Sequence, residues 1–427
     1  MNFYNNPAKE SWKELTLRPQ LELGFLESSV RNILNRVKKS GDQAIRELTL
    51  QFDKVEGQGL AVTRAEMEHA AQEVPPPLKK AIQTAAENVT KFHSAQRRDP
   101  QVMETMPGVK CWRKAVPITK VGIYIPGGTA PLFSTVLMLG IPASLAGCSE
   151  IILCTPPGKD GKIHSAILFA AALVGITKIF KVGGAQAIAA MTYGTETIPN
   201  VYKIFGPGNQ YVTKAKQLIT EEGVAIDMPA GPSEVLVLAD ETCNPAFVAA
   251  DLLSQAEHGE DSQVMLVLLD GSKLETIKKE LNSQLQELPR KGIAEKALAN
   301  SRAILFDRQA TAIEFINEYA PEHLIINTSN AVATSEQIIN AGSVFIGNFS
   351  PESVGDYASG TNHTLPTNGY AKAYAGVSLE SFLKYITYQQ LSESGIKNIG
   401  PFVEQLAEAE ALTAHRRAVS IRLQSLS

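Results

Sequence analysis

Two polar side chains at the end of an apolar segment are the first candidates for chemistry in this sequence. Gln255 and His258 lie in DLLSQAEHGEDSQ, residues 251–263, which reads as the end of a helix before Gly259. On a helix, a spacing of three residues places both side chains on one face, about one turn apart. An imidazole and an amide oxygen that point the same way are ligand types of half a metal site. The alternative is an amphipathic helix with an ordinary polar edge, and the segment alone favours that alternative.

A carboxylate and an imidazole are adjacent at Glu322 and His323. They follow a predicted helix at the start of a predicted strand over 323–327, so they point to opposite sides if the strand has begun. Such a pair can divide the roles of general base and water activation. A single Glu-His pair is common without that role, so it predicts little alone.

A long polar segment, residues 348–369, carries Asp356 and His363. Long segments without regular pattern in compact domains are usually functional or disordered, and the apolar and aromatic residues in this one favour order. Asp356 is a candidate metal ligand; the alternative is an Asx turn after Gly355.

The C-terminal segment is predicted to be one helix over about 402–423, carrying Glu410 and His415. These two residues are five apart and do not share one helical face. Without other information, the segment reads as a solvated helix.

The elements that must position these residues follow an α/β pattern. Residues 1 to about 100 have helical periodicity, with a break at prolines 75–77. From about residue 116, short apolar strands alternate with helices, which is typical of βαβ units with parallel sheets. The predicted strands are 121–125, 151–154, 178–182 and 201–205 in a first run, and 235–238, 264–269, 303–306, 323–327 and 343–346 in a second.

Glycines stand at two predicted strand-to-helix junctions, GGAQA at 183–187 and GPGN at 206–209. Backbone N–H groups at such a junction can bind an anion such as a pyrophosphate. Neither segment is GxGxxG, so tight turns alone explain the glycines equally well.

Composition limits the function classes. A chain of 427 residues predicts two or more domains, and a net charge of −4 gives no reason to expect nucleic acid or a membrane as partner. Four scattered cysteines predict neither a disulfide framework nor a thiolate zinc site. No signal peptide is visible, and the longest apolar run, 130–147, contains Pro142 and predicts a buried helix and turn. We therefore expect a cytoplasmic protein.

Eight of the residues above match one known family, and the sequence resembles the histidinol dehydrogenases. The matching segments follow the family's order and span nearly the whole chain. They are VGIYIPGGTAPLFSTVLML at 121–139, VGGAQAIAA at 182–190, IFGPGNQYVTKAK at 204–216, IDMPAGPSEVLVLAD at 226–240, DLLSQAEHGEDSQ at 251–263, YAPEHL at 319–324, GNFSPESVGDYASGTNHTLPT at 347–367 and AEAEALTAHRRAV at 407–419.

The resemblance implies a zinc- and NAD-dependent enzyme. Such an enzyme would oxidise L-histidinol to L-histidine in two NAD-linked steps, through bound L-histidinaldehyde, at the end of histidine biosynthesis. One zinc ion per subunit would be bound by Gln255, His258, Asp356 and His415, with His415 supplied by the partner in an intertwined homodimer.

The resemblance also implies individual roles. His323 corresponds to the general base and Glu322 to the carboxylate that activates water. Further matches are substrate contacts at Ser233, His363 and Glu410, the last supplied by the partner. The zinc ligands and His323 would also contact the substrate. NAD contacts correspond to Tyr124, Gln186 and Asn209.

The implied fold is α/β, with two incomplete Rossmann-like domains that resemble aldehyde dehydrogenases, although no cysteine here stands in a motif suited to a thiol nucleophile. We expect a helical segment at 1–22, a main domain of 23–118 with 236–377, an inserted NAD-contacting domain at 119–235, and a dimerisation tail at 378–427.

One departure from the family pattern is Ala411, where Gly is expected, and the segment 370–376 receives no role. Two other functions stay open. One is a dehydrogenase for another amino alcohol, and the other is a catalytically silent relative that serves as a binding protein. The presence of Ser233, His363 and Glu410 argues against the first, and the intact Glu322, His323 and zinc ligands argue against the second.

Overall fold

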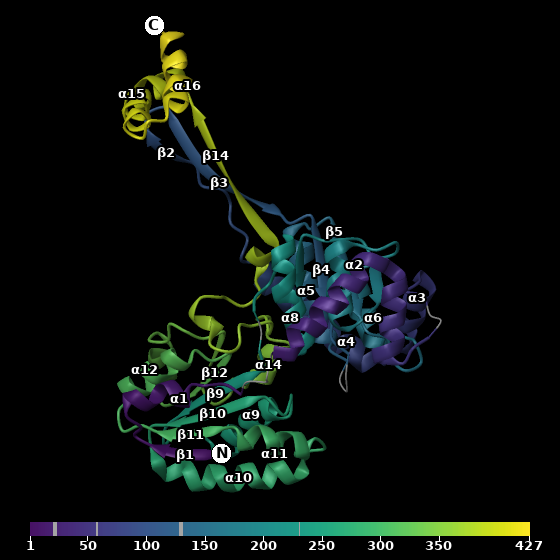
Figure 1. The fold of residues 1–427 in the computed structure, drawn as a ribbon. Helices are drawn as coiled ribbons and strands as arrows, with labels where there is room; N and C mark the ends of the chain where they lie inside the picture. Colours follow the sequence, from purple (N-terminus) through teal and green to yellow (C-terminus); the bar gives the residue numbers. More distant parts are fainter. Residues whose placement is uncertain (20–23, 57–58, 128–130, 230) are drawn as a thin grey trace.

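Two parallel sheets and a projecting arm make up the molecule, as seen in a computed structural model (Figure 1). The structure describes residues 1–19, 24–56, 59–127, 131–229 and 231–427. The mixed α/β class predicted from the sequence is confirmed. None of the described helices is both long and apolar enough to cross a membrane.

The first sheet has five parallel strands in the order β6-β5-β4-β7-β8. Helices connect consecutive strands, as the βαβ pattern requires. The strands are β4 (Lys120–Tyr124), β5 (Glu150–Thr155), β6 (Lys178–Lys181), β7 (Lys203–Phe205) and β8 (Ala225–Ile226). The connecting helices are α5 (Phe133–Ala146), α6 (Ser165–Leu173), α7 (Gly184–Tyr193), α8 (Gln210–Ile219) and the 3-10 turn η2 (Thr220–Glu222). The buried helix predicted within 130–147 is confirmed as α5, while residue 130 lies outside the described residues.

Three N-terminal helices pack onto this first sheet unit. They are α2 (Gly24–Asp53), α3 (Arg64–Glu73) and α4 (Pro76–Ser94). Helix α2 packs against α7 and α8, α3 against α6, and α4 against α5. Val30 and Leu48 of α2 share one core with Ile188 and Ile204. The predicted grouping of 23–118 with 236–377 is therefore not the observed packing, because the apolar stripes of these helices are buried by the other sheet unit.

The second sheet has six parallel strands in the order β1-β11-β10-β9-β12-β13. Its strands are β1 (Asn2–Asn5), β9 (Glu234–Ala239), β10 (Gln263–Leu268), β11 (Arg302–Leu305), β12 (His323–Asn327) and β13 (Ser343–Ile346). The segment 1–22, expected to be helical, instead contributes an edge strand before η1 (Lys9–Ser11) and α1 (Trp12–Leu15). The boundary expected between residues 22 and 23 lies outside the described residues.

Alternate residues of the central strands face two separate cores. Val235 and Val237 of β9 pack under the helices of one face, whereas Leu236 and Leu238 join Trp12 on the other. This period of two is what a sheet covered on both faces requires. The first face is covered by α9 (Pro245–Ala256), α10 (Leu274–Glu287) and α11 (Lys291–Ala299), and the second by α1 and α12 (Gln309–Tyr319). The remaining short elements are α13 (Ala331–Ser335), α14 (Glu352–Tyr357), η3 (Gly271–Lys273), η4 (Tyr370–Lys372) and η5 (Leu379–Phe382).

The arm is an antiparallel ribbon with two helices at its tip (Figure 1). It consists of β2 (Met103–Met106), β3 (Val109–Pro117), β14 (Leu383–Leu391), α15 (Glu393–Ala409) and α16 (Thr413–Gln424). All nine residues of β14 pair with β3. The single helix predicted over 402–423 is wrong, because the chain turns between α15 and α16. Ala411 makes this turn with a φ of 59°.

Candidate functional site

A cleft of about 1660 Å³ lies between the two sheet units. All but two of the predicted site residues line it. Tyr124, Gln186 and Asn209 reach it from the first sheet unit; Ser233, Gln255, His258, Glu322, His323, Asp356 and His363 reach it from the second unit and the segment after β13.

Opposite edges of the two sheets face this cleft. The first sheet contributes its carboxyl edge, where Tyr124 ends β4 and α7 begins at Gly184 after β6. The second sheet contributes its amino edge, where His323 begins β12. Helix α9 runs back along the second sheet, so its last turn brings Gln255 to the same edge.

Gln255 is fully buried, and neither atom of its amide has a hydrogen-bond partner among the described residues. A buried polar group without a partner is costly, so a site that leaves both atoms free points to a ligand. His258 follows in the turn after α9, where its N–H donates to the Gln255 carbonyl, and its imidazole lines the cleft. Both members of the predicted pair therefore line the cleft, although His258 lies just past the end of α9 and not within the helix that the spacing predicted.

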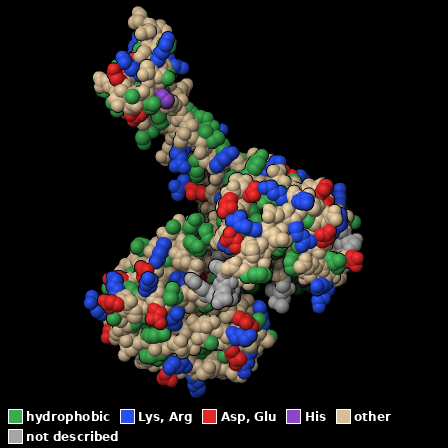
Figure 2. All heavy atoms as spheres, in the orientation of Figure 1, with side chains coloured by type: hydrophobic (Ala, Val, Ile, Leu, Met, Phe, Trp, Pro, Cys, Tyr) green, Lys and Arg blue, Asp and Glu red, His purple; other side chains and the backbone are tan. Residues whose placement is uncertain are grey.

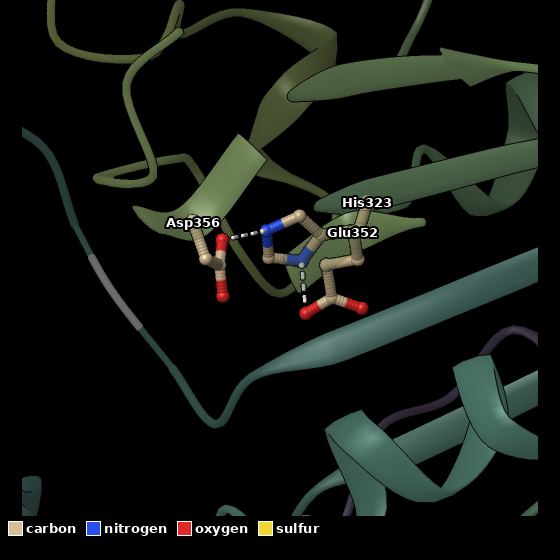
Figure 3. A group of neighbouring side chains, drawn as sticks. All are labelled: His323, Glu352 and Asp356. Atoms are coloured by element: carbon tan, nitrogen blue, oxygen red, sulfur yellow. Dashed lines mark ion pairs between the residues drawn. The ribbon is translucent and has the colours of Figure 1, made fainter. Parts of the chain in front are cut away.

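His323 is buried beside three carboxylates from two segments: Glu322, which precedes it in the chain, and two residues of α14, Glu352 and Asp356, which Figure 3 shows. Its Nδ1 lies 3.2 Å from the carbonyl oxygen of Glu234, and the Nε2 atom lies 3.6 Å from Asp356 Oδ1. Carboxylate oxygens of Glu322 and Glu352 lie 3.6 Å and 3.7 Å from Nδ1. A carbonyl can only accept, so the Glu234 contact places the proton on Nδ1 and leaves the Nε2 lone pair toward the cleft.

These groups shift one another's proton affinities. Burial raises the pKa of Glu322 to about 8, against the opposing effects of His323 and the Glu234 N–H. Burial also raises the pKa of Glu352 to about 7. Burial alone would lower the pKa of His323, but the charges of Glu352, Glu322 and Asp356 outweigh it and raise this pKa. Groups with shifted pKa values in a cleft are typical of catalytic sites.

Asp356 lies at the other nitrogen of the His323 ring from Glu322, and His363 contacts the Asp356 backbone. Burial would raise the pKa of Asp356, but the close contact with His323, whose Nε2 lies 3.6 Å from Oδ1, holds this pKa below its ordinary value, so the carboxylate stays ionised. His363 Nδ1 lies 2.8 Å from the Asp356 carbonyl oxygen, and its Nε2 lies 3.0 Å from Thr135 Oγ1. Burial lowers the pKa of His363, which favours the neutral imidazole.

The first sheet unit presents backbone turns to the cleft. The Gly184 N–H donates to Tyr124 Oη at 3.0 Å, which fixes the tyrosine at the start of α7. Gly206 has a φ of 128°, and a Cβ there would collide with the Tyr124 carbonyl oxygen, so this turn requires glycine. Asn209 Oδ1 caps α8 by accepting from two backbone N–H groups, which leaves its amide nitrogen for other contacts.

Glu352, which contacts His323, and the buried Asp251 of α9 are two acidic residues that the sequence did not single out. Each lies four residues, about one helical turn, before a predicted ligand, Glu352 before Asp356 and Asp251 before Gln255. Both are buried, and burial raises the pKa of each to about 7. The spacing was the available signal, but burial depends on tertiary packing. His323, Glu352 and Asp356 also form a cluster whose ligand atoms lie within 4.8 Å of one another.

Glu410 and His415 do not join this cleft within one chain. Glu410 directly follows α15 and His415 lies on α16, and both are exposed on the arm. Apolar side chains are also exposed along the arm, where they form part of its visible surface (Figure 2). They include Tyr385, Ile386, Tyr388, Phe402, Leu406, Leu412 and Ile421.

Comparisons with known proteins identify the family to which the chain belongs. The family model described as histidinol dehydrogenase matches residues 17–423. A histidinol dehydrogenase of Bacteroides fragilis is 61% identical over 427 residues, which is 100% of both chains. A chloroplastic histidinol dehydrogenase of Arabidopsis thaliana is 51% identical over 96% of this chain and 89% of its own.

A solved structure shows the same similarity in three dimensions. The crystal structure of histidinol dehydrogenase from Elizabethkingia anophelis is 56% identical, covers 100% of this chain and 98% of its own, and has a TM-score of 0.98. The chain therefore belongs to the histidinol dehydrogenase family.

Proposed function

We propose that this chain oxidises L-histidinol to L-histidine in two successive NAD-linked steps, through bound L-histidinaldehyde, as the last enzyme of histidine biosynthesis in the cytoplasm. The observation that carries the proposal is the cleft itself. A buried imidazole and carboxylate at the amino edge of one sheet face the glycine turns at the carboxyl edge of the other. One wall therefore offers acid–base groups, and the other offers backbone N–H groups suited to a dinucleotide.

The residues present fit a zinc ion. Gln255 offers an amide oxygen without a partner among the described residues, and His258 and Asp356 add an imidazole and an ionised carboxylate in the same cleft. These donor types suit zinc. When bound, zinc would orient the substrate through its imidazole and amino nitrogens. The fourth predicted ligand, His415, would come from a second copy, since α16 lies on the arm.

In the first oxidation, His323 takes the alcohol proton, and NAD⁺, when bound at the other wall, would accept the hydride. Its Nε2 has no hydrogen-bond partner among the described residues and is oriented by the Nδ1–H donated to Glu234. This is the arrangement of a general base: one ring nitrogen is held and the other is available. The three surrounding carboxylates then stabilise the imidazolium that forms.

In the second oxidation, the aldehyde must gain an oxygen from water before hydride leaves again. Glu322 is buried beside His323 and accepts the Glu234 N–H through Oε2 at 2.9 Å. With a pKa raised to about 8, its carboxylate is a stronger base than an exposed glutamate and can take a proton from water. Ser233 and His363 line the same space and are the proposed substrate contacts, with Glu410 from the second copy.

The proposed assembly is a homodimer with shared sites. In one chain, Glu410 and His415 are exposed on an arm that also exposes apolar side chains. A second copy that covers this surface would both bury apolar area and complete the zinc site. Tyr124, Gln186 and Asn209 line the other wall of the cleft, where we place NAD.

The test is the amount of NADH formed per L-histidinol consumed, before and after chelation and return of zinc. We expect two NADH per substrate, with activity lost on chelation and restored by zinc. One NADH per substrate would show that the aldehyde escapes and would overturn the role of Glu322. No NADH from a folded, zinc-bound protein would overturn the substrate assignment.

A further inference from the structure

Arg18 and Glu234 form a buried ion pair beside the cleft. Arg18 Nε donates to Glu234 Oε2 at 2.7 Å and Nη2 donates to Oε1 at 3.1 Å, so the pair is bidentate. The two side chains are 9% and 1% exposed. Bidentate pairing fixes the plane and position of the carboxylate as well as its charge.

Tyr319 holds both members of this pair. The Arg18 guanidinium lies 3.7 Å from the centroid of the Tyr319 ring, and its Nη2 donates to the Tyr319 carbonyl at 2.6 Å. The Tyr319 hydroxyl lies 3.2 Å from Glu234 Oε2 and 2.9 Å from Gln263 Oε1. The Glu234 side chain is therefore fixed from two directions.

The backbone of Glu234 holds both proposed catalytic side chains. Its N–H donates to Glu322 Oε2 at 2.9 Å, and its carbonyl accepts from His323 Nδ1 at 3.2 Å. The ladder between β12 and β9 begins with the pair of His323 and Val235. Glu234 lies one residue before that pair, so its peptide groups are free to bind side chains.

We infer that Glu234, fixed by Arg18 and Tyr319, is a positioning residue that sets the orientation of the general base and of the water-activating carboxylate together. This inference rests on the proposed function. Its basis is that one residue's peptide groups hold both side chains while its own side chain is anchored from outside the cleft. A buried ion pair adds little stability over an apolar pair of similar size, which is consistent with a role in geometry.

The test uses two variants that change the anchor without touching the cleft chemistry. Arg18→Lys keeps the charge but loses the bidentate geometry. Tyr319→Phe removes only the hydroxyl near Glu234 Oε2. Arg302→Lys is the matched control, because Arg302 binds the same N-terminal segment through the Leu17 carbonyl at 3.0 Å and makes no hydrogen bond to Glu234 among the described residues.

Kinetics are measured on the full-length protein and expressed per folded, zinc-loaded chain, alongside thermal denaturation. We expect Arg18→Lys to lower kcat about tenfold and Tyr319→Phe about threefold, with KM for histidinol within about twofold, because misplacement of acid–base groups affects the chemical step rather than substrate binding. Arg302→Lys should keep the wild-type kcat.

A purely structural role would lower the melting temperature of Arg18→Lys and leave kcat per folded chain unchanged, and that result overturns the inference. A rise of about tenfold in the KM of Arg18→Lys for histidinol, with no change in kcat, would also overturn the inference, since it would assign Arg18 to substrate binding and not to the chemical step. If the wild-type protein itself forms no NADH from histidinol, the proposed function fails, and the inference fails with it.

Discussion

At the scale of single residues, Glu322 links the stability of the fold to pH. Burial raises its folded pKa to about 8, above the ordinary value near 4.5. The stability that this protonated group contributes is therefore fully present below the unfolded pKa and is lost as pH rises through about 8. In the zinc-free protein, we expect this group to lower the free energy of unfolding by about 1 kcal/mol per pH unit between about pH 5 and pH 8.

Urea denaturation at several pH values, with a chelator present, measures that slope. Glu322→Gln should have a shallower slope than the wild type, because the amide does not titrate. The exposed Glu318, which pairs with Lys372 at 2.9 Å, gives the control Glu318→Gln, and its slope should match the wild type. Equal slopes for wild type and Glu322→Gln would contradict the prediction.

Residues that the sequence offered as candidates line this cleft, but the sequence did not show the interactions among them. Spacing and residue type singled out Gln255 with His258, Glu322 with His323, and Asp356, and the family motifs gave them roles. Glu352 was missed. The sequence shows an ordinary acidic residue after a proline, and only the packing of α14 against β12 buries it beside His323.

At the scale of elements, the turn between α15 and α16 carries local strain. Ala411 has a φ of 59°, a left-handed conformation that costs a residue with a Cβ about 1–2 kcal/mol. Ala411→Gly removes that cost, but glycine also raises the conformational entropy of the unfolded chain, which opposes folding. We therefore expect a net stabilisation of about 0.5–1 kcal/mol. Ala418→Gly, within α16, is the matched control and should destabilise by about 1 kcal/mol. Denaturant unfolding distinguishes the two, and equal effects would contradict this account of the turn.

The turn at Ala411 was not predicted from the sequence. Residues 402–423 contain no glycine and no proline, so their helical periodicity gave no reason to expect a break at Ala411. By contrast, the buried strands of both parallel sheets were predicted within a few residues, and β12 and β13 to the residue. Their continuous apolar runs carry a strong signal.

The ribbon and the N-terminal helices were harder for a different reason. Strand β14 is largely exposed and β3 is only partly buried, so both lack the apolar pattern of a buried strand and were not predicted. The stripe of α2 predicted a buried face, but periodicity does not say which sheet buries it. The observed packing of α2 onto α7 and α8 comes from tertiary structure alone.

At the scale of the whole molecule, the proposed dimer with shared sites predicts complementation between two inactive variants. His415→Ala and His258→Ala should each lose zinc and activity as homodimers. A hybrid dimer would contain one intact site, made of the cleft of the first chain and the arm of the second. We expect about half of wild-type activity from purified hybrids, or about a quarter from a statistical mixture.

Co-expression with two affinity tags and sequential purification isolates the hybrid. The control combines His323→Ala with His258→Ala, since both changes lie in the same cleft and no hybrid site is complete. Activity in the control would contradict the assignment of these residues to one chain. A hybrid of His415→Ala and His258→Ala without activity would contradict the donation of His415 across the dimer.

The arm has a further consequence for how activity emerges after synthesis. Both parallel sheets have cores of their own within a single chain, whereas His415 and Glu410 lie on the arm, away from the cleft. In the proposed dimer, folding of the cleft is a first-order event, whereas completion of a shared site is second order in protein. Newly made chains would gain activity at a rate set by their concentration. The lag between synthesis and activity would therefore be longest in a cell that makes little of the protein.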